Sequence, residues 1–223
     1  MRVVRSVAEM DRTSKRNVVE VVLVFIVIAT FLWFGRRSFP GANPVFAVLL
    51  LAILVYAHRL AGEGFREVGF RRDTFAATGR LLLPLMFIGA TLIIAAALAL
   101  DGMQFPTWQA GLRRAAEFVA LGIVQQYLLV GFFFRRVERI TSPGLAPALT
   151  ASIFALLHLP NVFLMVVTFV AGIIACLVYR RSPNLWANGL AHGLMSVLLY
   201  YALPRSVTSG LRVGAEYVAA LTG

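Results

Sequence analysis

The chain has 223 residues, of which 60% are hydrophobic, and its mean hydropathy is +0.82. A water-soluble domain of this length cannot bury so much apolar surface, whereas lipid removes the need to bury it. The net charge is +11, but the basic residues stand in short groups between apolar stretches, as membrane topology signals do. We therefore exclude nucleic-acid binding and expect an all-α protein, a polytopic transmembrane bundle of about six to eight helices in contact with membrane lipid.

The apolar stretches follow one another along most of the chain. They cover residues 18–35, 44–58, 81–100, 115–134, 146–159, 162–179 and 185–203, with approximate ends. Several are shorter than the about 20 residues that a crossing helix needs, so we expect those to tilt or to pack inside the bundle. Cys176, the single cysteine, lies in such a stretch and is expected to be a buried apolar side chain without a disulfide.

The basic groups predict the orientation of the bundle. They lie before the first stretch, between the second and third, after the fourth and after the sixth, so all fall on one side. The positive-inside rule makes this side cytoplasmic, and the smaller groups at Arg36, Arg37, Arg113 and Arg114 face the other side. We expect a multi-pass protein of a bacterial inner membrane with its N-terminus inside and its first span retained.

The chain is divided into regions by these patterns. We expect a basic cytoplasmic N-terminus over residues 1–16 and a transmembrane bundle over 17–205, with a core of functional motifs at about 115–203. The mildly amphipathic tail at 206–223 is expected to lie along the membrane interface.

Polar side chains inside the apolar stretches are the candidates for function, because each is costly in lipid unless it is paired or faces a cavity. They are Gln125 and Gln126, then His158 four residues after Phe154, and finally Asn188, His192 and Ser196. The four-residue spacing places the last three on one helix face. Neighbouring glutamines point about 100° apart, so both can border one cavity. The simpler interpretation is that these groups only form hydrogen bonds between helices.

Two other polar residues are given structural roles. Glu117 follows Arg113 by four residues and is expected to form an interfacial ion pair of little energetic value. His58, beside Arg59 at the end of a stretch, is interpreted as an interfacial residue.

The motifs resemble those of the CAAX-processing and bacteriocin-processing (CPBP, or Abi) intramembrane endopeptidases, the type II CAAX prenyl endopeptidase family. That family has two adjacent glutamates followed by an arginine, then Phe-x-x-x-His, then His-x-x-x-Asn. This chain has Gln125-Gln126, Phe154-x-x-x-His158 and His192-x-x-x-Ser196 in the same order. Residues 67–72 also resemble a stretch common between early spans of the family. The departures are the two glutamines, a valine in place of the arginine (Val130) and Ser196 in place of the asparagine.

The resemblance implies an intramembrane endopeptidase that cleaves a hydrophobic or lipidated peptide or protein at or near the membrane. By position, Gln125 with Gln126 stands where the base stands and His158 is its partner. His192 and Ser196 stand where the family stabilises the oxyanion, and we expect Phe154 and Asn188 to contact substrate.

A glutamine amide cannot take up a proton, although its oxygen can orient a water, so His158 becomes the candidate base. Two functions remain open: an endopeptidase with an altered mechanism, and an inactive relative that keeps the cavity as a scaffold or to hold a peptide or lipid.

A metal site, a serine nucleophile and a transporter are less favoured, because each lacks residues or patterns that it needs. A catalytic zinc site takes three protein ligands, and only His158 and His192 are obvious, so we expect no metal and no other cofactor. A Ser196 nucleophile activated by His192 would have no orienting carboxylate. A transporter is expected to show repeats, broken helices or midplane charges, and we find no such pattern.

Overall fold

The computed structural model describes residues 7–35 and 42–222, and these ranges are mainly helical and contain no strand. The predicted all-α bundle is confirmed. The helices are α1 (Val7–Thr30), α3 (Ala42–Ala61), α4 (Phe65–Val68), α5 (Phe75–Ala99), α6 (Trp108–Gln126), α7 (Arg135–Val137), α8 (Ala146–Leu156), α9 (Val162–Arg181), α10 (Leu185–Ala202), α11 (Arg205–Thr208) and α12 (Gly214–Thr222). Two π-helical segments, η1 (Phe31–Gly35) and η2 (Tyr127–Phe134), continue α1 and α6, and a 3₁₀ turn, η3 (Ser209–Leu211), follows α11.

Five helical segments are long and apolar enough to cross a membrane. They are Asp11–Gly35, Asn43–Ala61, Phe75–Ala99, Trp108–Val137 and Val162–Arg181. The other two predicted stretches are also helical: α8 has only 11 residues, and α10 is made less apolar by the polar residues that it carries. The chain is thus an integral membrane protein.

The helix ends differ from the predicted ones. The α1 helix begins at Val7, inside the predicted N-terminal region, and α5 begins at Phe75. Hydropathy detects only the apolar part of a helix, whereas the helix itself can continue through polar turns at the interface. The basic residues Arg2, Arg5, Arg36 and Arg37 lie outside the described residues.

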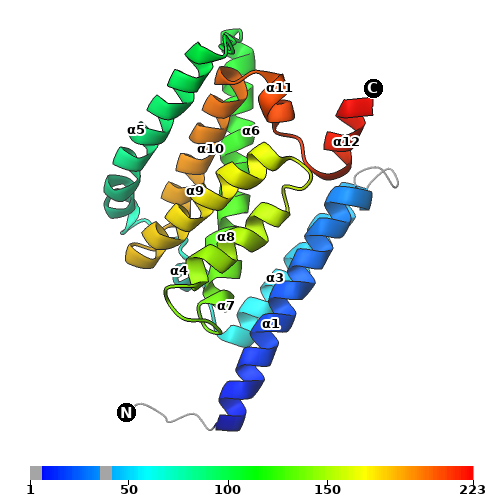
Figure 1. Cartoon of the computed structure of the whole chain (residues 1–223). Helices are drawn as coiled ribbons and strands as arrows, with labels where there is room; N and C mark the ends of the chain where they lie inside the picture. Colours follow the sequence, from blue (N-terminus) through cyan, green and yellow to red (C-terminus); the bar gives the residue numbers. More distant parts are fainter. Residues whose placement is uncertain (1–6, 36–41, 223) are drawn as a thin grey trace.

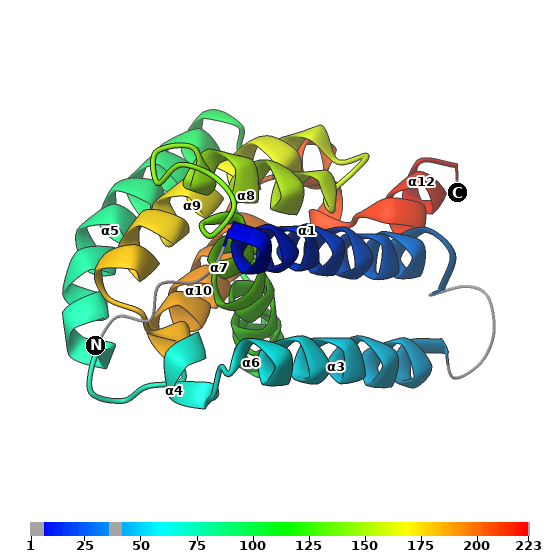
Figure 2. The same cartoon turned by 90° about the horizontal axis from the view of Figure 1, so that it is seen from below.

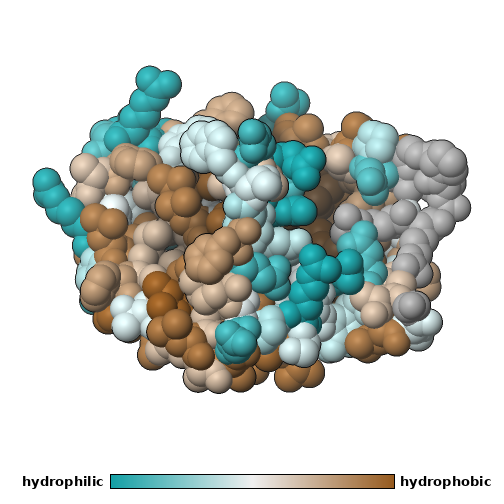
Figure 3. All heavy atoms as spheres, turned by 90° about the horizontal axis from the view of Figure 1, so that it is seen from above, coloured by the Kyte–Doolittle hydropathy of each residue, from teal (hydrophilic) through white to brown (hydrophobic). Residues whose placement is uncertain are grey.

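The bundle has two sides that are joined by a helical hairpin (Figures 1 and 2). On one side, α10 packs against α5 and α6; on the other, α1 lies alongside α3. The hairpin of α8 and α9 lies between them and packs against η2, the continuation of α6. Part of the predicted C-terminal tail forms α12, which contacts η1. Figure 3, which shows the structure from above, has hydrophilic residues across the middle of this end face and hydrophobic residues on either side of them.

Glycines bring α6 and α10 into close contact. A Cβ atom at Gly193 would lie 2.5 Å from the Cα of Val119, and one at Gly189 would lie 2.6 Å from the Cα of Ile123. Residue numbers therefore increase along α10 where they decrease along α6, which shows that the two helices are antiparallel. Because lipid supplies no hydrophobic drive between helices, such close packing of small residues holds them together.

Replacing Gly193 by alanine is expected to destabilise the protein by about 1–3 kcal/mol, because the backbone of α6 must move to admit the methyl group. Thermal unfolding in detergent measures this. Gly79→Ala on α5 is the control, since a Cβ there has no atom within 4 Å. A Gly193→Ala variant that unfolds at the wild-type temperature would show that the crossing is not tightly packed.

A buried ion network joins α1 and the α3–α4 connection to α7. The side chain of Arg136 is fully buried, and it donates to Glu20 at 2.9 Å and to Glu63 at 3.2 Å. Glu63 also accepts hydrogen bonds from Arg135 and Arg139. Burial raises the pKa of Glu63, but the hydrogen bonds from His58 and Arg135 and the charges of Arg135 and Arg136 hold it well below its usual range.

His58 and Glu117 were both expected to have structural roles, and the structure shows the surroundings of each. His58, interpreted as an interfacial residue, lies in the last turn of α3. It is buried there, with Nδ1 2.8 Å from Glu63. The predicted ion pair of Glu117 is confirmed: it is exposed and lies 3.8 Å from Arg113 and 2.8 Å from Arg114.

Candidate active site

A hydrogen bond between α6 and α10 lies at the centre of the candidate site. Side chains tilt toward the N-terminus of their own helix, so on antiparallel helices those of Gln126 and His192 point toward each other. The Nε2 atom of buried Gln126 lies 3.0 Å from Nδ1 of His192. With the amide nitrogen as donor, Nδ1 is the acceptor and the proton of the neutral ring is on Nε2. His192 therefore presents an N–H donor on its other edge.

His158 has the opposite arrangement. It is buried in the turn after α8, and its Nδ1 lies 2.9 Å from the backbone oxygen of Phe154. A carbonyl can only accept, so the proton is on Nδ1 and Nε2 carries a free lone pair. The Phe154 ring packs edge-on against the imidazole, with 5.0 Å between ring centroids.

The side chains of the other polar residues of the predicted site form no hydrogen bond with either histidine side chain among the described residues. Gln125 and Ser196 are partly buried, and neither side chain has a hydrogen-bond partner among the described residues. Ser196 lies one turn after His192 on α10. Asn188 is buried, and its Nδ2 donates to the backbone oxygen of Asn184 at 2.8 Å, so its amide stabilises the first turn of α10.

No charge stands where the family has its arginine. Val130 is completely buried in the main hydrophobic core, together with Val68 and Leu185. The Oε1 atom of Gln126 is a buried acceptor without a partner in the described part of the chain. In residues 7–35 and 42–222, no three His, Cys, Asp or Glu side chains lie together as metal ligands. The site therefore offers neutral donors and acceptors.

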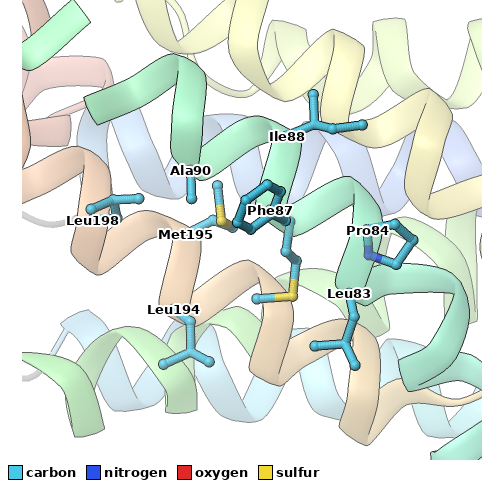
Figure 4. Close-up of a pocket in the computed structure, with 9 residues that line it drawn as sticks. Leu83, Pro84, Phe87, Ile88, Ala90, Leu194, Met195 and Leu198 are labelled. Carbon is cyan, nitrogen blue, oxygen red and sulfur yellow. The ribbon is translucent and has the colours of Figure 1, made fainter. Parts of the chain in front are cut away.

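An open apolar groove of about 750 Å³ lies between α5 and α10 (Figure 4). Leu83, Pro84 and Phe87 come from α5, and Leu194, Met195 and Leu198 come from α10. Since α10 lies between α5 and α6, this groove is on the other side of α10 from the Gln126–His192 contact. None of the predicted site residues lines it.

Sequence reasoning missed the buried network of Glu20, Glu63 and Arg136. Its arginines were interpreted only as topology signals. Glu20 carries a detectable signal, because it is an acidic residue inside the first apolar stretch, where an unpaired charge is costly. Such a residue predicts a partner, although not which one.

The fold and site define a multi-span membrane protein with one histidine at the end of α8 and a second that links α10 to α6. Residues 107–198 match the family of Rce1-like type II CAAX prenyl endopeptidases. This match supports the family recognised from the motifs, and it covers the segment from the start of α6 into α10. At the level of the family, this match supports a CAAX-protease-like membrane endopeptidase. No curated protein and no solved structure matches the chain.

Proposed function

We propose that the chain is an active intramembrane endopeptidase in which His158 activates a water and His192 stabilises the oxyanion. The observation that carries this proposal is the pair of complementary tautomers: Nε2 is a free base on His158 and a donor on His192. One ring can accept a proton while the other donates a hydrogen bond, and no carboxylate is needed for either arrangement.

The first step is the attack of water on the scissile carbonyl carbon. The Nε2 atom of His158 takes a proton from the water while the water oxygen forms the new bond to the carbonyl carbon. The imidazolium keeps its hydrogen bond to the Phe154 oxygen, whose partial negative charge stabilises the new positive charge. The unpaired Oε1 of Gln126 can accept a hydrogen bond from the same water and orient it.

The second step is collapse of the tetrahedral intermediate. Its oxyanion accepts hydrogen bonds from Nε2–H of His192 and from the hydroxyl of Ser196, which are preorganised on one face of α10. His158 then returns its proton to the amide nitrogen, the C–N bond breaks, and a carboxyl and an amine product leave. This scheme uses no metal or organic cofactor.

The substrate that fits this position is a hydrophobic or lipidated peptide or protein, since the site lies on helices embedded in lipid. Gln125, Phe154 and Asn188 are assigned supporting roles around it. We also infer a cytoplasmic N-terminus in a bacterial inner membrane and the division into residues 1–16, 17–205 and 206–223. The charge distribution of the loops supports this orientation.

A second candidate function is a catalytically inactive scaffold that holds a peptide or lipid. Two glutamines and Val130 together replace the charged residues of the family, so the site has no unpaired buried charge. A scaffold that lost catalysis would be expected to lose these charges together, because an unpaired buried charge is strongly destabilising.

Cleavage of fluorogenic hydrophobic and prenylated peptides by the purified protein tests the proposal. Replacing His192 by alanine removes an oxyanion donor and is expected to lower kcat by about 10²–10³-fold. Gly79→Ala, on an open part of α5, is the control and is expected to cleave at the wild-type rate. Equal rates for His192→Ala and the control would contradict the assignment.

A further inference from the structure

A pocket separate from the histidines lies where the connection before α5 meets the start of α10. It has a volume of about 500 Å³ and is lined by Arg71, Arg72, Phe75 and Trp186. Phe75 is the first residue of α5, and Trp186 is in the first turn of α10. The pocket is therefore at the N-terminal ends of α10 and of α5, which is a candidate membrane span.

The pocket walls are held in place by hydrogen bonds from the chain segment before α10. The side chain of Asn184 is fully buried and donates to the backbone oxygen of Arg71 at 2.6 Å and to Thr74 at 3.1 Å. Thr74 in turn donates to the backbone oxygen of Pro183 at 2.9 Å. Because residues distant in sequence are tied together, the pocket is already formed without a ligand.

The charge of the pocket is positive. Arg71 donates to Asp73 at 2.7 Å and Arg66 does so at 2.8 Å, so one carboxylate pairs with two guanidinium groups. The hydrogen bond from Arg71 outweighs desolvation and lowers the pKa of Asp73 to about 2, so this carboxylate stays charged. Arg72 is exposed and has no hydrogen-bond or ion-pair partner in the described ranges. Its N–H groups are available to an anion.

The two aromatic side chains give the pocket an apolar wall. Phe75 and Trp186 are each 42% exposed. The Trp186 ring packs against Phe70, with centroids 5.3 Å apart, which fixes its position. Tryptophan is enriched at membrane interfaces, where its ring lies at the level of the lipid headgroups.

We propose that this pocket binds the phosphate headgroup of an anionic phospholipid. The phosphodiester oxygens accept hydrogen bonds from Arg72, whose planar guanidinium can form two parallel bonds to them. Trp186 and Phe75 pack against the glycerol and the first methylenes of the acyl chains. The lipid is favoured over a soluble phosphate because a soluble ion would leave these apolar walls uncovered at the membrane surface.

Native mass spectrometry of the detergent-purified protein, titrated with phosphatidylglycerol or phosphatidylcholine, tests this proposal. The wild type is expected to bind phosphatidylglycerol about tenfold more tightly. Arg72→Gln is expected to lose this preference. Arg59→Gln is the matched control: Arg59 is also exposed and is near the end of α3, so the change removes one charge without touching the pocket.

Three results would overturn the proposal. The first is a wild type without preference for phosphatidylglycerol, and the second is an equal loss in Arg72→Gln and Arg59→Gln, which would indicate unspecific attraction. The third is displacement of the lipid by millimolar inorganic phosphate, which would indicate a site for free anions. Equal unfolding temperatures of the two variants establish that each is folded.

Discussion

Replacing Arg136 by methionine is expected to destabilise the protein by about 3–5 kcal/mol, the usual cost of removing one partner from a buried ion pair. The Arg136 side chain is fully buried, and its two carboxylate partners are nearly so: Glu20 is 11% exposed and Glu63 is 3% exposed. Methionine fills similar space but removes the buried partner of Glu20, whose carboxylate keeps only the partly exposed Arg16, 3.4 Å away. Yield and thermal unfolding in detergent measure the loss.

A double variant distinguishes the loss of a charge pair from the loss of packing. Glu20→Gln in the Arg136→Met background removes the carboxylate that has lost its buried partner, while Glu63 keeps Arg135 and Arg139 as partners. Much of the lost stability is expected to return. If the double variant were less stable than Arg136→Met alone, the network could not be the origin of the effect.

The same network predicts how stability depends on pH. The pKa of Glu63 is lower in the folded chain than its ordinary value of 4.5. The stabilisation that the Glu63 carboxylate contributes is therefore complete above about pH 4.5. It is lost as the pH falls toward the lower pKa of Glu63 in the folded chain. Wild type and Glu63→Gln should differ most in unfolding temperature near neutral pH and converge in acid. A constant difference from pH 7 to pH 3 would contradict this.

Replacing His158 by alanine is expected to reduce kcat by about 10²–10⁴-fold, the usual contribution of a general base. The backbone oxygen of Phe154 fixes the proton on Nδ1, so Nε2 is the only basic atom that the ring presents to a substrate. Alanine removes this atom but keeps the Phe154 side chain. The effect should appear in kcat more than in KM, because His158 acts on the water and not on substrate binding.

His158→Gln provides a sharper comparison than alanine alone. Glutamine preserves a polar side chain of similar reach but cannot take up the proton. If His158 is the base, this variant is expected to be as slow as His158→Ala. Full activity in His158→Gln would mean that the residue only forms hydrogen bonds, and that another group accepts the proton.

Much of the bundle follows from the sequence because hydropathy and helix geometry act locally. Each predicted stretch contains a helix, and the meeting of Gln126 with His192 is compatible with their positions on neighbouring apolar segments. The four-residue spacing also places His192 and Ser196 on one face. What the spacing does not predict is which of the two glutamines contacts the histidine, since that depends on the rotation of α6 against α10.

The ion network shows why other features could not be predicted. Arg136 and Glu20 are 116 positions apart, and their contact depends on how α1 docks against α7. The sequence alone does not distinguish an arginine that faces the cytoplasm from an arginine that pairs with a buried carboxylate. The role of Asn188 was similarly ambiguous, because an asparagine on the histidine face can also donate to its own helix.

Hydrolysis of a peptide bond with both glutamines in place distinguishes an enzyme from a scaffold. Wild type and the double variant Gln125→Glu with Gln126→Glu are incubated with the same peptide panel, and the products are identified by mass spectrometry. We expect turnover by the wild type at a single peptide bond, slowed by about 10²–10⁴-fold in His158→Ala. Products from the double variant alone would contradict it, and would identify the natural chain as a scaffold without catalytic activity.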